Sequence, residues 1–153
     1  MASEEQQEKS PSSATYEAGC HCGYIKFAFT LSPGLDEYKV MECNCSGCTR
    51  FGYLLVYPEA KDVVWHNNGR ERCSVYQFNT KEKDQMFCPK CGASIGIDFR
   101  EVLMPRRYGI SVRTIYGLDL EKLIYKKGDG RTRLLPATDT SGHYWDEEKQ
   151  ELK

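Results

Sequence analysis

The chain has 153 residues, with 21 basic and 22 acidic side chains and a formal net charge of −1. This length fits one domain, and the near-neutral charge argues against nucleic acid as a partner, because phosphate backbones are bound through many Lys and Arg contacts. No stretch approaches the ~20 apolar residues that a membrane helix needs, so we expect no membrane partner.

Residues 1–14 are rich in Ser, Glu and Gln, and we expect them to form a disordered N-terminal tail. They lack the apolar stretch of a secretory signal, so we expect a cytoplasmic location that can extend to the nucleus. In such a reducing compartment, eight cysteines indicate metal ligands before disulfides. We expect a zinc-binding domain over residues 15–135.

Seven short segments have the alternation, or the β-branched and aromatic content, of strands. In the clearest of them, 24–31, the side chains of Ile25, Phe27 and Phe29 alternate with side chains of the opposite face. The other segments are 38–42, 52–57, 63–65, 74–79, 93–99 and 108–115. Strands of this length and spacing predict a mainly β, antiparallel fold.

One segment, 118–125 with the sequence LDLEKLIY, indicates a short helix that ends before Gly128. The glycine-rich run 128–131 follows this helix instead of opening one, so we interpret it as a turn and not as a phosphate loop. The last segment, 136–153, is polar, and we expect an irregular C-terminal extension whose aromatic pair, Tyr144 and Trp145, docks on the sheet.

Seven of the cysteines fall into three groups, of which CPKCG at 88–92 is the most specific. In such a turn the proline fixes one backbone angle and Gly92 permits a left-handed conformation after the second thiolate. Backbone N–H groups can then donate to the sulfurs. Cys88 and Cys91 are therefore predicted to bind zinc, and a closed zinc site needs two further ligands.

The pair Cys20 and Cys22 is the natural complement, because residues i and i+2 of an extended segment face the same side. Together with Cys88 and Cys91 it makes a closed structural site of four thiolates, with His21 facing away. This site would join the start of the domain to its middle. In theory, a cross-link that closes so long a loop stabilises the fold more than one that closes a short loop.

The remaining group, Cys43, Cys45 and Cys48, offers three thiolates in six residues. Three protein ligands with a fourth position left for water or substrate is the pattern of catalytic zinc. The alternative is a second structural site, closed by Cys73, a His or an Asp. Zinc held by three thiolates is a weak Lewis acid that suits a soft ligand, so an open site favours carbon–sulfur chemistry over hydrolysis.

The segments GCHCG at 19–23, CNCSGC at 43–48 and FCPKCG at 87–92 resemble, in order and approximate spacing, the glutathione-dependent formaldehyde-activating enzyme family, which also contains centromere protein V. The resemblance implies a zinc-stapled fold of the β-tent kind, carbon–sulfur lyase activity and a glutathione adduct as the small-molecule substrate. It implies a structural zinc on Cys20, Cys22, Cys88 and Cys91, and a second zinc, where adducts react, on Cys43, Cys45 and Cys48.

Two residues near the second group are candidates for substrate binding. Arg50 could hold a carboxylate of glutathione, and the alternative is a solvated surface arginine. Tyr53 could donate to a substrate oxygen, and the alternative is core packing. Many family members carry basic residues directly after the third cysteine, whereas Thr49 precedes Arg50 here, so the choice of substrate stays open.

Two functions therefore compete. The first is a zinc-dependent carbon–sulfur lyase, or the reverse adduct-forming enzyme, with a thiol sulfur at an open three-cysteine zinc. The second is a non-catalytic binding module in which both zinc ions are structural and the partners are protein or chromatin. A closed fourth ligand at the second zinc would favour the module, and the acidic balance weakens its chromatin version.

Overall fold

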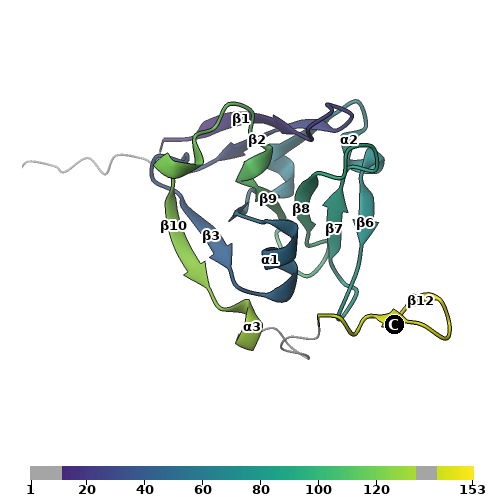
Figure 1. Cartoon of the computed structure of the whole chain (residues 1–153). Helices are drawn as coiled ribbons and strands as arrows, with labels where there is room; N and C mark the ends of the chain where they lie inside the picture. The colour runs from purple at the N-terminus through teal and green to yellow at the C-terminus, as the bar shows by residue number, and fades with distance from the viewer. Residues whose placement is uncertain (1–11, 134–140) are drawn as a thin grey trace, which may run out of the picture.

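The computed structural model describes residues 12–133 and 141–153 (Figure 1). Most of the expected tail, 1–14, lies outside the described residues, and at its end Ala14 already begins the first strand. No helix within the described residues is long and apolar enough to cross a membrane.

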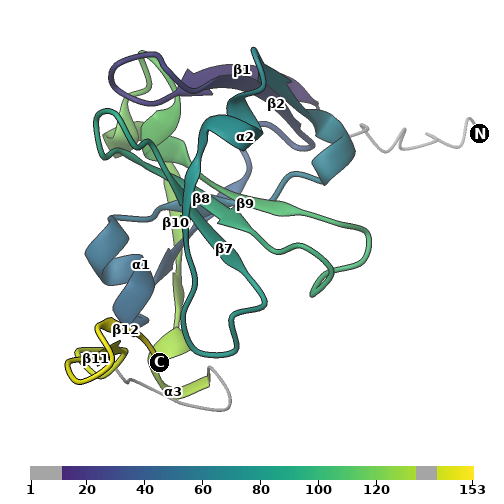
Figure 2. The ribbon, with the colours of Figure 1, turned by 90° about the vertical axis from the view of Figure 1, so that its right-hand side faces the viewer.

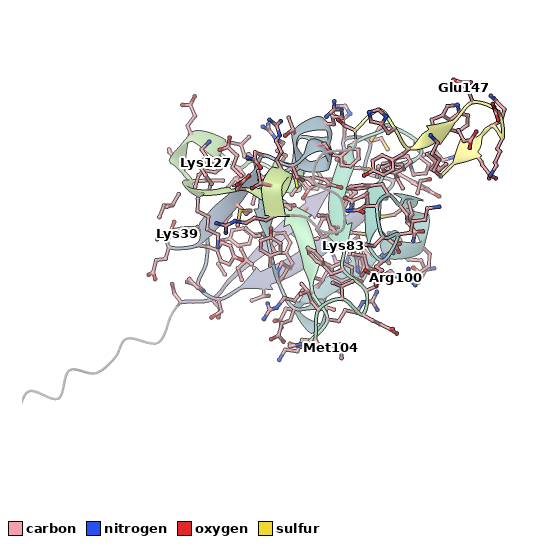
Figure 3. The ribbon with its side chains drawn as sticks, turned by 90° about the horizontal axis from the view of Figure 1, so that it is seen from below. Lys39, Lys83, Arg100, Met104, Lys127 and Glu147 are labelled. Atoms are coloured by element: carbon pink, nitrogen blue, oxygen red, sulfur yellow. The ribbon has the colours of Figure 1, made fainter. Side chains whose placement is uncertain are left out.

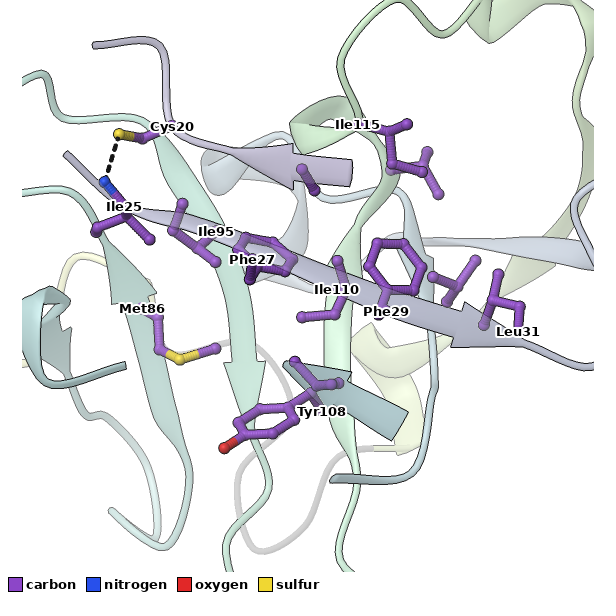
Figure 4. Packing of buried hydrophobic residues seen from close by; sticks show 14 of the residues in the cluster. Cys20, Ile25, Phe27, Phe29, Leu31, Met86, Ile95, Tyr108, Ile110 and Ile115 are labelled. Carbon is purple, nitrogen blue, oxygen red and sulfur yellow. Dashed lines mark hydrogen bonds between the residues drawn. The ribbon is translucent and has the colours of Figure 1, made fainter. Parts of the chain in front are cut away.

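A three-stranded antiparallel sheet in the order β1-β2-β5 forms one side of the core, from β1 (Ala14–Gly19), β2 (Lys26–Leu31) and β5 (Val63–His66). In strand β2 the side chains of Phe27, Phe29 and Leu31 are buried as predicted, although Ala28 of the opposite face is buried too. The three larger side chains pack with Ile95 and Ile110 of the second sheet in one apolar cluster (Figure 4).

The second sheet has seven strands in the order β10-β3-β4-β9-β8-β7-β6, and every pairing is antiparallel except that of β10 with β3. The mainly β fold of short strands is therefore confirmed. Figures 1 and 2 show the β1–β2 layer covering one end of this larger sheet. The strands are β3 (Lys39–Cys43), β4 (Leu55–Val56), β6 (Ser74–Tyr76), β7 (Asp84–Phe87), β8 (Ser94–Asp98), β9 (Tyr108–Ser111) and β10 (Ile124–Gly128).

The helices are short and lie between the strands. The helix α1 (Ser46–Phe51), which sequence patterns did not predict, lies in Figure 1 between the β3–β10 and β6–β7 parts of the larger sheet. Six residues are too few for a periodic pattern, and α1 begins on a cysteine cap and ends at Gly52, which has a left-handed φ of 67°. The others are α2 (Gly69–Arg72), α3 (Gly130–Arg133) and the 3₁₀ turns η1 (Ala60–Asp62), η2 (Val112–Thr114) and η3 (Leu120–Lys122).

The helix predicted over 118–125 is wrong. Only the 3₁₀ turn η3 forms there, with the Asp119 side chain capping the N–H of Glu121. The chain then extends as β10, parallel to β3, with Ile124 opposite Lys39 and Gly128 opposite Cys43. Pairing along the free edge of β3 satisfies backbone groups over five residues, which outweighs the weak helix propensity of a two-turn segment.

The C-terminal extension has local order in its described part. Strands β11 (Trp145–Asp146) and β12 (Glu151–Leu152) form a small antiparallel hairpin. The Tyr144 ring packs edge-on against Phe78, with centroids 5.6 Å apart, whereas Trp145 is about half exposed. The predicted docking on the sheet is therefore wrong in part: Tyr144 packs on Phe78, which lies in the loop after β6 and not in a strand.

A buried carboxylate ties three segments together beside the larger sheet. Asp98, which is fully buried in β8, accepts hydrogen bonds from Arg106 Nη2 at 2.7 Å, from Arg70 Nε at 3.2 Å and from the Arg100 N–H at 2.8 Å. Burial by itself would raise the pKa of Asp98, but these donors outweigh it and hold the pKa below its ordinary value.

Candidate metal centres and the adjoining cavity

Four cysteine sulfurs meet between the β1–β2 turn and the β7–β8 turn. The Sγ atoms of Cys20, Cys22, Cys88 and Cys91 all lie within 4.8 Å of one another. The Cys20–Cys22 and Cys22–Cys88 sulfur distances are 3.7 Å and 3.9 Å. A tetrahedron with Zn–S bonds of about 2.3 Å has S–S edges of about 3.8 Å, so these four sulfurs fit a closed zinc site.

The two turns that carry these cysteines differ from each other. The 88–92 turn has the predicted form, because Gly92 has a φ of 79° and the Lys90 N–H lies 3.4 Å from Cys88 Sγ. The expected extended conformation of Cys20 and Cys22 is wrong: they lie in a turn closed by a 3.0 Å bond from the Cys20 N–H to the Ile25 carbonyl. The turn nonetheless brings both sulfurs to the same site.

The burial of two of these cysteines is consistent with a structural role for the group. Cys20 and Cys88 are almost fully buried and belong to the main apolar cluster, whereas Cys22 and Cys91 are exposed. A metal ion held by all four would therefore join the core to two surface turns. His21 is exposed and is not part of the group, as expected.

A second group forms where β3 meets α1. Cys43 ends β3, Cys45 is the N-cap of α1 and Cys48 lies in its first turn, and their three Sγ atoms lie within 4.8 Å of one another. Among the described residues, no fourth His, Cys, Asp or Glu joins this group at that distance. The arrangement offers three sulfurs to one ion.

The side chains considered as a fourth ligand have other surroundings. Cys73 Sγ lies 3.4 Å from the Gly69 carbonyl, and Cys73 packs against the main apolar cluster that contains Cys20 and Cys88. Burial raises the pKa of the Cys73 thiol to about 11. His66 Nε2 lies 3.3 Å from a carboxylate oxygen of Glu17.

The electrostatics of the second group favour a cation. Hydrogen bonding between the Cys45 and Cys48 side chains lowers the pKa of Cys45 and raises the pKa of Cys48, because one of two adjacent sulfurs holds the negative charge. The Cys48 N–H, at the start of α1, also donates to Cys45 Sγ at 3.3 Å. A bound cation is what allows all three sulfurs to be thiolates together, and sulfur ligands suit zinc.

A cavity of about 520 Å³ adjoins the second group, and Cys43, Cys45 and Cys48 all line it. Its walls combine apolar and aromatic side chains with a few charged ones. The apolar and aromatic side chains are Met41, Leu55, Tyr57, Phe78, Ile97 and Phe99. The charged ones are Lys83, Lys127, Asp129 and Arg133, and Figure 3 labels both lysines in the view from below.

Asn44 fastens one wall of this cavity to the cysteine loop. Its backbone N–H donates to the Gly128 carbonyl at 3.1 Å, and its side chain bonds to Asp129 Oδ1 and to the Arg131 N–H, each at 3.0 Å. The predicted turn at 128–131 is therefore wrong: Gly128 ends β10 and Gly130 begins α3, so the run follows a strand and opens a short helix. Residues 128–130 line the cavity. In the sequence, the position of Asn44 between Cys43 and Cys45 was the feature that could have indicated this contact.

The two predicted substrate contacts lie outside the cavity lining. Arg50 is exposed on α1, donates to the Ser46 carbonyl at 3.2 Å and borders a separate groove with Phe51 and Tyr144. Tyr53 is buried, and its hydroxyl lies 3.1 Å from both Gln85 Oε1 and the Gly96 carbonyl. Burial raises its pKa, and the Gln85 that it contacts does line the cavity. A role in substrate binding stays a prediction for both.

Comparison with known proteins agrees with this geometry. The family model described as glutathione-dependent formaldehyde-activating enzyme matches residues 15–119. The crystal structure of a Rhodobacter sphaeroides protein is similar at a TM-score of 0.60 and 26% identity, over 72% of this chain and 99% of that one. Because the family match spans most of the chain and includes all seven clustered cysteines, this protein belongs to the glutathione-dependent formaldehyde-activating enzyme family.

Proposed function

We propose that the protein is a carbon–sulfur lyase that breaks, or in reverse forms, an adduct between glutathione, or another thiol, and a carbon electrophile. One observation carries this proposal. The four-sulfur group provides a complete zinc site, whereas the three-sulfur group has no fourth ligand among the described side chains and lies on a cavity. A site of that kind is open to a ligand from solution.

We place one zinc ion in each group. When bound to Cys43, Cys45 and Cys48, zinc supplies a soft Lewis acid that favours negative charge on a sulfur. For an adduct with a hydroxyl on the same carbon, the hydroxyl loses its proton and a carbonyl forms as the carbon–sulfur bond breaks. The electron pair of that bond leaves on the sulfur, which takes up a proton, so no oxidant or further reactant is needed.

The charged side chains of the cavity match the charges of glutathione, which has two carboxylates and one ammonium group. Lys83, Lys127 and Arg133 offer positive charge, and Asp129, oriented by Asn44, offers negative charge. Lys127 Nζ is held 2.8 Å from a carboxylate oxygen of Glu42. These groups would bind the ends of glutathione and direct its sulfur toward the cysteines.

We also propose a cytoplasmic location, because zinc binding by cysteines requires reduced thiols. All eight cysteines are free, and each clustered cysteine must stay reduced to serve as a ligand. The cytoplasm also holds reduced glutathione, the expected co-substrate. A small molecule, and neither a membrane nor nucleic acid, is the partner that the cavity suits.

The direct test incubates the zinc-loaded protein with a panel of glutathione adducts and follows the release of free thiol. We expect turnover of at least one adduct, and Lys83→Ala should raise KM about tenfold with little change in kcat, because a surface charge mainly serves binding. Lys39→Ala is the matched control, since Lys39 is an exposed lysine at the start of β3 outside the cavity lining.

Arg50→Ala, measured beside these variants, tests the sequence-based expectation for that residue, which a raised KM would support. No turnover across the panel, with the second zinc bound by four protein ligands in spectroscopy, would favour the binding module instead.

A further inference from the structure

The aromatic side chains of the cavity have no partner in glutathione itself. Phe78, Phe99 and Tyr57 line the cavity with three aliphatic side chains, whereas glutathione is a charged peptide. A one-carbon adduct adds only a small polar group to the sulfur. It would leave these aromatic walls in contact with water, which is unfavourable.

The walls are fixed in place, so they are not free to collapse onto a small ligand. The Phe78 ring lies nearly parallel to Tyr76 at 5.7 Å and edge-on to Tyr144 at 5.6 Å. Against α1 it packs so closely that a Cβ at Gly47 would come within 3.1 Å of the ring.

Phe99 is supported in the same way on the side of β4 and β9. Its ring lies 5.9 Å from Tyr57, and a Cβ at Gly109 would come within 3.1 Å of it. Lys83 Nζ lies 5.5 Å from the centroid of the same ring. A preformed apolar wall therefore stands beside a positive charge.

Parts of this cavity come from outside the segment that matches the family. The match ends at residue 119, whereas Lys127, Asp129 and Arg133 line the cavity and Tyr144 supports Phe78. The Rhodobacter sphaeroides protein is covered over 99% of its length by 72% of this chain, so part of this chain has no counterpart there. The cavity is thus built in part from residues outside the segment that the family model matches.

From this geometry we propose that the substrate adduct carries a bulky apolar group, aromatic or long-chain, on the carbon side of its carbon–sulfur bond. The apolar group lies between Phe78 and Phe99, while the charged side chains hold the peptide end. The inference rests on the proposed function, because it assumes that a thiol adduct occupies this cavity. The electrophile that the reaction releases or takes up would then be an aldehyde, or a related compound, that carries a bulky apolar group.

The test measures binding without turnover. Zinc-loaded full-length protein is titrated calorimetrically with S-methylglutathione and with S-benzylglutathione, which are stable thioethers. We expect the benzyl compound to bind at least about tenfold more tightly, because its ring transfers from water to the apolar walls. Equal affinities, tighter binding of the methyl compound, or no binding of either would overturn the inference.

Phe78→Ala should reduce the preference to about threefold or less, because one wall is lost. Val75→Ala is the control, since Val75 is exposed on β6 and outside the cavity lining, and it should keep the full preference. An equal loss in both variants would count against the inference. Turnover of adducts without any benzyl preference would overturn this inference and leave the lyase standing, whereas a benzyl preference without turnover would support the apolar site and reject the lyase.

Discussion

The substitution Cys48→Ala separates a catalytic second zinc from a structural one. Cys48 is 9% exposed in the first turn of α1 and lines the cavity, so removing its sulfur enlarges that space by about the volume of a small group. A void the size of a methyl group costs about 1 kcal/mol. Alanine has a helix propensity up to about 0.7 kcal/mol better than cysteine, and the backbone N–H of residue 48 can still donate to Cys45 Sγ, the N-cap acceptor.

These terms nearly offset each other, so the free energy of unfolding should fall by less than about 1 kcal/mol. For a chain of this size, that corresponds to a melting temperature lower by about 2–4 °C or less. Turnover should be lost, because the open site keeps only two of its three ligands. The zinc content should fall from two ions per chain to one.

The assay combines thermal unfolding by circular dichroism, zinc analysis and adduct turnover on one preparation. Cys73→Ala controls for the loss of a thiol as such, since Cys73 is half-buried and outside both sulfur groups, and it should keep its zinc and its turnover. A fall in melting temperature of more than about 10 °C for Cys48→Ala, or full turnover without the second zinc, would refute the reasoning.

Three further predictions concern the rest of the molecule. Cys88→Ser should abolish folding, because a structural zinc supplies about 10–16 kcal/mol, comparable to the whole stability of a domain; soluble, zinc-poor protein with a normal melt would contradict this. A mild chelator should remove one zinc and all turnover before the melting temperature falls, and added zinc should restore turnover; simultaneous loss of both ions and of the fold would argue against an open site. Asp98→Asn should cost about 1.5–3 kcal/mol at neutral pH, because charged hydrogen bonds are lost while the half-exposed Arg106 is hydrated and Arg70 keeps its pair with Asp84. The pKa of Asp98 is lower in the folded state, so the contribution of Asp98 to the free energy of unfolding is complete above about pH 4 and is lost as the pH falls below that value. The melting temperatures of wild type and variant should therefore converge in acid. A gap that stays constant with pH would contradict the prediction.

Cysteine spacing predicted the two sulfur groups because metal geometry leaves few choices. A turn with Gly92 in a left-handed conformation presents Cys88 and Cys91 to one point, whatever the surrounding fold. The alternation of Phe27 and Phe29 was equally informative, because one face of β2 is buried in the core. In both cases the local determinants lie within a few residues of each other, although the complete four-sulfur group joins Cys22 to Cys88 across 66 residues.

The cavity could not be predicted, because its walls are distant in sequence and depend on pairing. Helix α1 is too short to show the hydrophobic periodicity of a helix. Strand β10 has a helix-like sequence, and its extended conformation depends on pairing with the free edge of β3. Neither the 78–83 loop nor the 128–133 corner carries a motif that points to the cysteines. Arg50 lies two residues after Cys48 on α1, and residues at that spacing on a helix do not face each other, so closeness in sequence did not place Arg50 at the cavity.

The register of β10 along β3 links the metal chemistry to substrate binding. It sets Gly128 opposite Cys43, where a Cβ would lie 3.6 Å from the Cys43 Cα and would displace the flexible end of the Met41 side chain. Because Gly128 is fixed there, Lys127 and Asp129 on either side of it reach the cavity beside the three sulfurs. A slip by one residue would exchange the faces of these side chains and remove the charges from the site. The strand that sequence patterns misassigned as a helix is thus the element that couples the cysteines to the groups proposed to hold glutathione.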